Sequence, residues 1–370
     1  MRTGLAVLVY VGMMVVVLAG TPGLAATPRP PMEGPPPMEE RSDDAQHGWV
    51  AELGERPGRP EWGPLAILED QAALCEPAVA ASRDKVTTER RRAALLLGLL
   101  GMAEGVPALE TLRQDADREV RMQAGVSLCL LGEDSGLPAA RVALGYAPAW
   151  LRYYAVAGLW RVGGRRAEEA LQNARPHLSR FLQDCVEQAL AAPWEPVAEG
   201  VEVVADRAHA PADRADLWGQ VADALISECD WWWHKGNYDQ CIRCLEASLV
   251  FDPQNVEGYS NIGWLQWSMG RHGEAISTYR RAIAANPLSW DAADELANYY
   301  RMQKRYLLAE KYYAQAARLG SPPIQRRAWG HVLEILGRYD EARQVWQQIL
   351  QLDPNDPIAR RQLERLAGEQ

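Results

Sequence analysis

Apolar and small residues recur along most of the chain at the spacing of amphipathic helices. The pattern begins near Leu65, and from there short helical stretches alternate with breaks that contain glycine or proline. The stretches "RRRAALLLGLLG", "RMQAGVSLCLLG" and "RYYAVAGLWRVG" each have the pattern of one helix that ends at a glycine, the residue best suited to a helix C-terminus. The sequence therefore predicts an all-α fold.

One set of helices repeats every 31 residues between about residues 61 and 195. The matching positions are Arg90, Arg121 and Arg152; Ala93, Ala124 and Ala155; Leu97, Leu128 and Leu159; and Gly101, Gly132 and Gly163. The segments "VPALETLRQ", "LPAARVAL" and "AEEALQNA" follow as second helices of the pairs. This pattern resembles HEAT repeats of the short bacterial type that also occurs in phycobilin lyases.

A second set of helices repeats every 34 residues between 214 and 370. Four segments align, namely "GNYDQCIRCLEASLVFDP", "GRHGEAISTYRRAIAANP", "KRYLLAEKYYAQAARLGSP" and "GRYDEARQVWQQILQLDP". Small, aromatic and proline positions recur together, so the pattern resembles the tetratricopeptide repeat, with "PIARRQLERLAGEQ" as a C-terminal capping helix. Lys304 replaces the glycine that ends the first helix in the other units, and we expect a looser turn there.

The two resemblances imply an all-α protein made of two stacked helical-hairpin solenoids, a HEAT-like array followed by a tetratricopeptide array. One helix pair buries too little apolar surface alone, and stacking gives a continuous core. In the tetratricopeptide family the first helix of each pair lines an inner groove. Residues 196–213 are expected to be a linker between the arrays.

The N-terminus has the pattern of an export signal. Arg2 precedes a short apolar run that ends in "TPGLAA", so we expect residues 1–26 to be a signal peptide cleaved after Ala25 or Ala26. An uncleaved membrane anchor is the alternative. Residues 27–60 are rich in proline and predict a disordered spacer. The body is therefore expected in the periplasm or outside the cell.

The composition narrows the function further. The net charge is −10 and no basic cluster occurs, so we expect no nucleic-acid partner. The G-x-S-x-G, H-E-x-x-H, P-loop and G-x-G-x-x-G motifs are absent, which predicts that the protein is not an enzyme and needs no cofactor. There are 14 Trp and only 2 Phe, and tryptophan suits both packing and binding surfaces.

The segment "CDWWWHKGNYDQCIRC" contains Cys229, His234, Cys241 and Cys244, which are zinc-ligand residue types. His234 is five residues past Cys229, about 140° away around a helix, so the four side chains do not converge. A metal-binding or redox module centred on Cys229–Cys244 stays as an alternative function.

Two of these cysteines occupy positions where the repeat requires small residues. Cys229 and Cys241 lie 34 residues before Gly263 and Ala275, where the helices of a pair cross. Facing Cα atoms at such a crossing come within the range that a disulfide tolerates. We hypothesise a Cys229–Cys241 disulfide in the exported protein, with two buried thiols as the equally weighted alternative.

The expected inner groove collects aromatic, amide and basic side chains. The candidate binding residues are Trp233, His234, Asn261, Trp264, Trp267, Asn298, Arg301 and Arg327. Grouped aromatics flanked by Asn and Arg favour a ligand surface. The sequence thus predicts a non-enzymatic scaffold of the cell envelope that binds a protein or peptide, and a lyase-like enzyme is a less favoured alternative that the HEAT resemblance suggests.

Overall fold

The computed structural model describes residues 5–8, 15–18, 72–191 and 210–368, and the expected spacer and most of the expected linker lie outside these ranges. Strands β1 (Leu5–Leu8) and β2 (Val15–Leu18) pair antiparallel, with Leu5 opposite Leu18. The remaining elements of the described residues are helices, which confirms the all-α class. The described helices divide at Thr278, inside α13, into two compact units, and each is described by itself.

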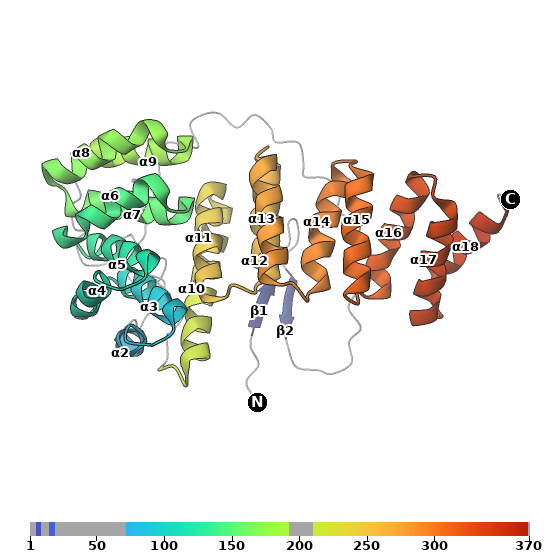
Figure 1. Ribbon diagram of the computed structural model, residues 1–370, viewed down its shortest axis with the longest axis horizontal. Helices are drawn as coiled ribbons and strands as arrows, with labels where there is room; N and C mark the ends of the chain where they lie inside the picture. The colour runs from blue at the N-terminus through green and yellow to red at the C-terminus, as the bar shows by residue number, and fades with distance from the viewer. Residues whose placement is uncertain (1–4, 9–14, 19–71, 192–209, 369–370) are drawn as a thin grey trace. The chain divides into compact units, whose positions relative to one another are not determined.

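The first unit begins with helices that follow the 31-residue step. They are α2 (Ala72–Ala81), α3 (Thr87–Leu100), α4 (Val106–Leu112), α5 (Arg118–Leu130), α6 (Leu137–Tyr146), α7 (Ala149–Val162), α8 (Gly164–Ala174) and α9 (Arg180–Ala191). The long helices α3, α5 and α7 begin 31 residues apart and pack side by side (Figure 1). Gly158 of α7 lies so close to α5 that an added Cβ would stand 2.7 Å from the Cβ of Cys129.

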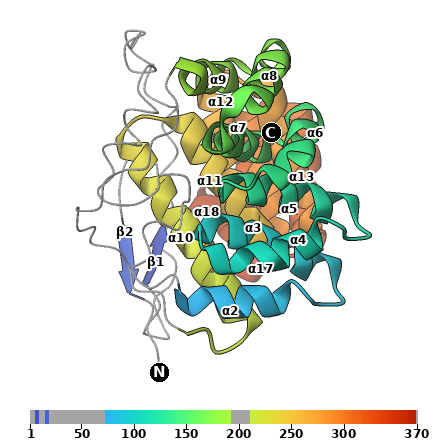
Figure 2. The same ribbon diagram turned by 90° about the vertical axis from the view of Figure 1, so that its left-hand side faces the viewer.

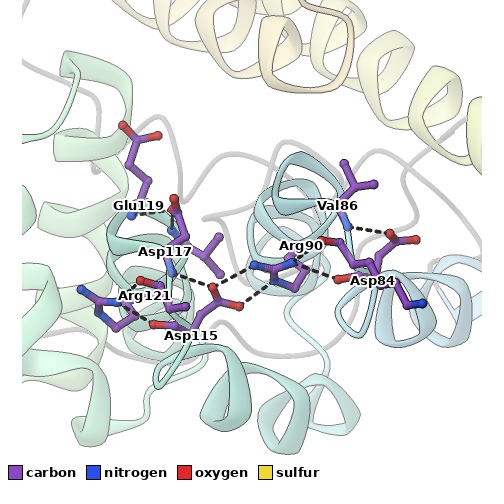
Figure 3. A network of polar contacts seen from close by, with 10 residues as sticks. Asp84, Val86, Arg90, Asp115, Asp117, Glu119 and Arg121 are labelled. Carbon is purple, nitrogen blue, oxygen red and sulfur yellow. Dashed lines mark hydrogen bonds and ion pairs between the residues drawn. The ribbon is translucent and has the colours of Figure 1, made fainter.

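The three periodic arginines each stabilise the loop before their own helix. Arg90, Arg121 and Arg152 donate to backbone carbonyls five or six residues earlier, over 2.6–3.0 Å. Arg90 also donates to both carboxylate oxygens of Asp115, which links one loop to the next (Figure 3). This hydrogen bond lowers the pKa of the Asp115 carboxyl. The repeated arginine is therefore a loop-fixing residue, which explains its 31-residue step.

Helices with the 34-residue step follow in the same unit. They are α10 (Arg214–His234), α11 (Tyr238–Phe251), α12 (Val256–Ser268) and the first half of α13 (His272–Ala285). The α10–α11 hairpin packs directly against the earlier helices, because α11 contacts α7 and α10 contacts α2 (Figure 2). The two helix arrays are thus joined by direct packing within this unit.

A buried ion pair lies at this junction. Arg243 of α11 contacts Glu228 of α10 at 2.6 Å, and each side chain is only 4% exposed. Arg243 also donates to the Tyr154 hydroxyl of α7 at 2.8 Å, and its guanidinium lies 4.9 Å from the ring centre of Tyr153. The Trp232 indole donates to Glu228 at 2.9 Å. These contacts tie the hairpin to α7.

The opposite end of the hairpin is held by α3. Arg92 donates to the carbonyl of Val250 at 3.1 Å, and Glu89 accepts from the Trp218 indole at 2.9 Å. Arg92 and Tyr154 are 62 residues apart, two steps of the 31-residue repeat, so equivalent positions of α3 and α7 both bind the hairpin. The inner row of the first array is therefore used inside the protein.

The second unit continues the 34-residue step. It contains the rest of α13 and the helices α14 (Trp290–Met302), α15 (Tyr306–Arg318), α16 (Pro323–Ile335), α17 (Tyr339–Leu352) and α18 (Pro357–Gly368). Trp346 and Ile349 of α17 are buried with Ala359 and Leu366 of α18, so α18 caps the core. Lys304 adopts a left-handed φ of 55°, close to the 71–74° of the glycines at the matching turns. The turn is thus retained despite the missing glycine.

We expect replacement of one member of the buried pair to destabilise the first unit strongly. Arg243→Met leaves the Glu228 carboxylate buried without its cation, and breaking comparable buried pairs costs about 3–5 kcal/mol. Urea unfolding followed by tryptophan fluorescence measures the loss. Glu228→Leu combined with Arg243→Met should recover part of it, because no unpaired charge remains.

Arg165→Met is the matched control for this prediction. The Arg165 side chain is 92% exposed and its partner Glu169 is 55% exposed. Exposed pairs of this kind contribute about 0–1 kcal/mol. Equal losses of stability in Arg165→Met and Arg243→Met would contradict the role of the buried pair.

Candidate functional site

Three tryptophans of α10 and α12 form the aromatic part of the predicted groove. The ring centres of Trp233 and Trp264 lie 5.9 Å apart, and Trp233 also lies 5.2 Å from Tyr238. Trp264 and Trp267 are three residues apart on α12 and so share one side of that helix. All three tryptophans are half-buried. We call Trp233, Trp264 and Trp267 the tryptophan face.

His234 and Asn261 follow the same two helices. His234 is exposed at the end of α10, and its Nδ1 lies 2.8 Å from the carbonyl oxygen of Asp230. Asn261 is half-buried on α12, one turn before Trp264. The sequence prediction thus places five candidate residues on two first helices of successive pairs.

The other three candidates lie in the second unit and have internal partners. Asn298 accepts from the Tyr313 hydroxyl at 2.7 Å, and Arg301 donates to the same hydroxyl at 3.1 Å. Tyr313 is buried in α15, and burial raises the pKa of its hydroxyl. Arg327 forms an ion pair at 2.8 Å with Asp356, whose side chain is 1% exposed. These three residues hold α14 to α15 and α16 to the start of α18, and their binding role stays a prediction.

The cysteines meet only in part. Cys229 and Cys241 are buried free thiols, and the Cys241 thiol lies 3.5 Å from the Cys229 carbonyl. A hydrogen bond with the Cys241 thiol, followed by burial, raises the pKa of Cys229 well above its usual range. Cys244 instead accepts from Arg243 at 3.1 Å. In the described parts of the chain, no three His, Cys, Asp or Glu side chains gather as a metal ion would require.

The sequence prediction missed Glu228 and Arg243. A signal was present, because Glu228 occupies a position where the next two units have Ile262 and Leu296, both fully buried. A charged residue at a buried apolar position requires a buried partner. Arg243 supplies that partner one helix later.

The paired helices and their aromatic surface define the class of helical-repeat interaction scaffolds. Residues 260–322 and 322–366 match family models that are both described as tetratricopeptide repeat. The resemblance drawn from the 34-residue step is therefore confirmed over this segment, which carries tetratricopeptide repeats. The hairpin α10–α11 precedes the matched residues.

A relative and two solved structures are similar to parts of this chain. Small glutamine-rich tetratricopeptide repeat-containing protein 2 of Saccharomyces cerevisiae is 28% identical over 82 residues, 22% of this chain and 21% of the yeast protein. The chain thus spans about a fifth of the length of that relative. The crystal structure of MamA has 21% identity and a TM-score of 0.32, covering 38% of this chain and 83% of MamA. YrrB, described as a TPR protein with an unusual peptide-binding site, has 18% identity and a TM-score of 0.32, covering 40% of this chain and 77% of YrrB.

His331 gives the second unit a titratable contact. Its ring centre lies 5.0 Å from that of Trp346, and its Nδ1 lies 3.8 Å from Glu334. Burial lowers the pKa of His331, Arg365 and Arg301 lower it further, and Glu334 opposes them. The folded state therefore binds the proton less readily than the unfolded state.

We expect this histidine to make the second unit less stable in mild acid. The stability that neutral His331 contributes is complete above the unfolded pKa of about 6.5 and is lost as pH falls from there through the lower folded pKa. Unfolding free energies of wild type and His331→Gln, measured from pH 8 to pH 5, test the point. The variant should lose less stability over this range, and parallel curves would rule out a contribution from His331.

Proposed function

We propose that this protein is an exported, non-enzymatic scaffold that binds a peptide or protein partner on the tryptophan face. The observation that carries the proposal is the contact of Trp233 with Trp264 across two successive helix pairs. Tetratricopeptide repeats over residues 260–366 support the interaction class.

The chemistry of the tryptophan face supports an extended ligand with apolar side chains. Half-buried indole rings present flat apolar area at little cost in side-chain entropy, and tryptophan is enriched at the centres of interfaces. Asn261 borders the rings with an amide that can both donate to and accept from a peptide backbone. Lys235 lies 5.3 Å from the Trp231 ring centre and adds a cation near the same end of α10.

Export is part of the proposal and is supported by the sequence of residues 1–26. A basic start, an apolar run and small residues at the end are the parts of an export signal. Among the helices of the described residues, none combines the length and apolar character needed to cross a bilayer. We propose that the mature chain acts in the cell envelope.

We expect a partner to contact the tryptophan face and to depend on Trp264. A photo-crosslinking amino acid at Trp267 should capture the partner in envelope extracts, whereas the same group at Tyr146, 78% exposed on α6, should not. Trp264→Ala should then weaken binding of the captured partner by about 2 kcal/mol, as the loss of aromatic anchors does. Calorimetry measures the change, with Tyr146→Ala as the control, and unchanged affinity of Trp264→Ala would exclude the tryptophan face.

The export proposal predicts a mature chain that begins at Ala26 or Thr27. Fractionation of a bacterial host that expresses residues 1–370, followed by N-terminal sequencing, identifies the start. Val16→Arg breaks the apolar run and should keep the full chain in the cytoplasm, because insertion of a charged residue opposes export. Recovery of an uncleaved chain in the membrane fraction would favour the anchor instead.

A further inference from the structure

Two cysteines face each other at the helix crossing of the first tetratricopeptide-like hairpin. The Cys241 thiol lies 3.5 Å from the Cys229 carbonyl, and the two residues are 0% and 6% exposed. They come from α11 and α10, the two helices that carry Arg243 and Glu228. The pair therefore lies inside the hairpin that joins the two arrays.

Packing alone does not require sulfur at these positions. The equivalent pairs in the later units are Gly263 with Ala275, Ala297 with Ala309, and Gly330 with Ala342. All six of these residues are buried, so small side chains fill the crossing in every other unit. Both positions change to cysteine together, and only in the unit that contacts the first array.

The remaining thiols of this region are engaged elsewhere. Cys244 is bound by the Arg243 guanidinium at 3.1 Å. Cys185 is buried on α9, where burial raises the pKa of its thiol. Cys241 thus has Cys229 as its neighbour across the crossing.

We infer that Cys229 and Cys241 form a disulfide that locks the α10–α11 hairpin when the chain folds in an oxidising medium. A disulfide exchange catalyst or oxidised glutathione accepts the two electrons. One thiol first attacks this disulfide and forms a mixed disulfide with release of one reduced thiol. The second cysteine thiol then displaces the other half, so two thiols and one external disulfide give the new bond and two external thiols.

The burial of both thiols sets the order of events. A folded hairpin keeps them from external disulfides, and the raised pKa of Cys229 disfavours the thiolate that exchange requires. Exchange therefore precedes the packing of α10 on α11. Once formed, the bond fixes the neighbours Glu228 and Arg243 opposite each other at the junction.

Trypsin separates the three cysteines of this region, which makes the test direct. Cleavage after Arg214, Lys235 and Arg243 places Cys229 in residues 215–235, Cys241 in 236–243 and Cys244 in the next peptide. The chain is refolded from denaturant with oxidised and reduced glutathione and then digested without reduction. We expect peptides 215–235 and 236–243 to be linked and two hydrogens lighter than their sum. Free thiols in both peptides, or a link to Cys244 instead, would overturn the inference.

Thermal unfolding tests the locking effect independently of any binding partner. A disulfide that closes about a dozen residues should raise the melting temperature of the oxidised chain by about 5–10 °C over the reduced chain. Cys229→Ala with Cys241→Ala copies the Ala297 and Ala309 pair and should melt at one temperature with or without reductant. Cys75→Ala is the control and should keep the wild-type shift. A linked wild-type chain without this shift would contradict the lock.

Discussion

The ion pair between Arg243 and Glu228 is the contact on which the joining of the two arrays depends. A buried charge is costly unless its hydrogen-bonding capacity is met, and here Tyr154 and Trp232 supply neutral partners beside the pair. Because the donors and acceptors come from α7, α10 and α11, only one seating of the hairpin satisfies them together. Apolar packing would hold these helices with less directional preference.

The repeats could be predicted from the sequence because repetition is what a period detects. The 31-residue step placed the starts of α3, α5 and α7, and the arginines at that step proved to fix the preceding loops. The junction is made by residues that depart from their repeat, such as Glu228 in the place of Ile262 and Tyr154 in the place of Arg92. A period averages such departures away, so the joined arrays were expected to be separated by a linker.

The candidate site shows the same division between what helical spacing decides and what it leaves open. Spacing identifies the side of α12 that carries Trp264 and Trp267, and the contact of Trp233 with Trp264 agrees with it. Spacing does not tell whether a side chain on that side already has a partner from the second helix. Tyr313 takes up both Asn298 and Arg301 from α15, and this hydroxyl became visible only in three dimensions.

Helix α10 connects the junction to the tryptophan face. Successive residues of a helix point about 100° apart, so Trp232 can bond Glu228 in the interior while Trp233 contacts Trp264 at the surface. A partner that binds Trp233 therefore meets a helix whose other side is already fixed by Glu228, Arg243 and α7. Such a surface loses little freedom on binding, which favours affinity at a given contact area. The buried pair thus acts on recognition through the rigidity of α10, without any contact to the partner itself.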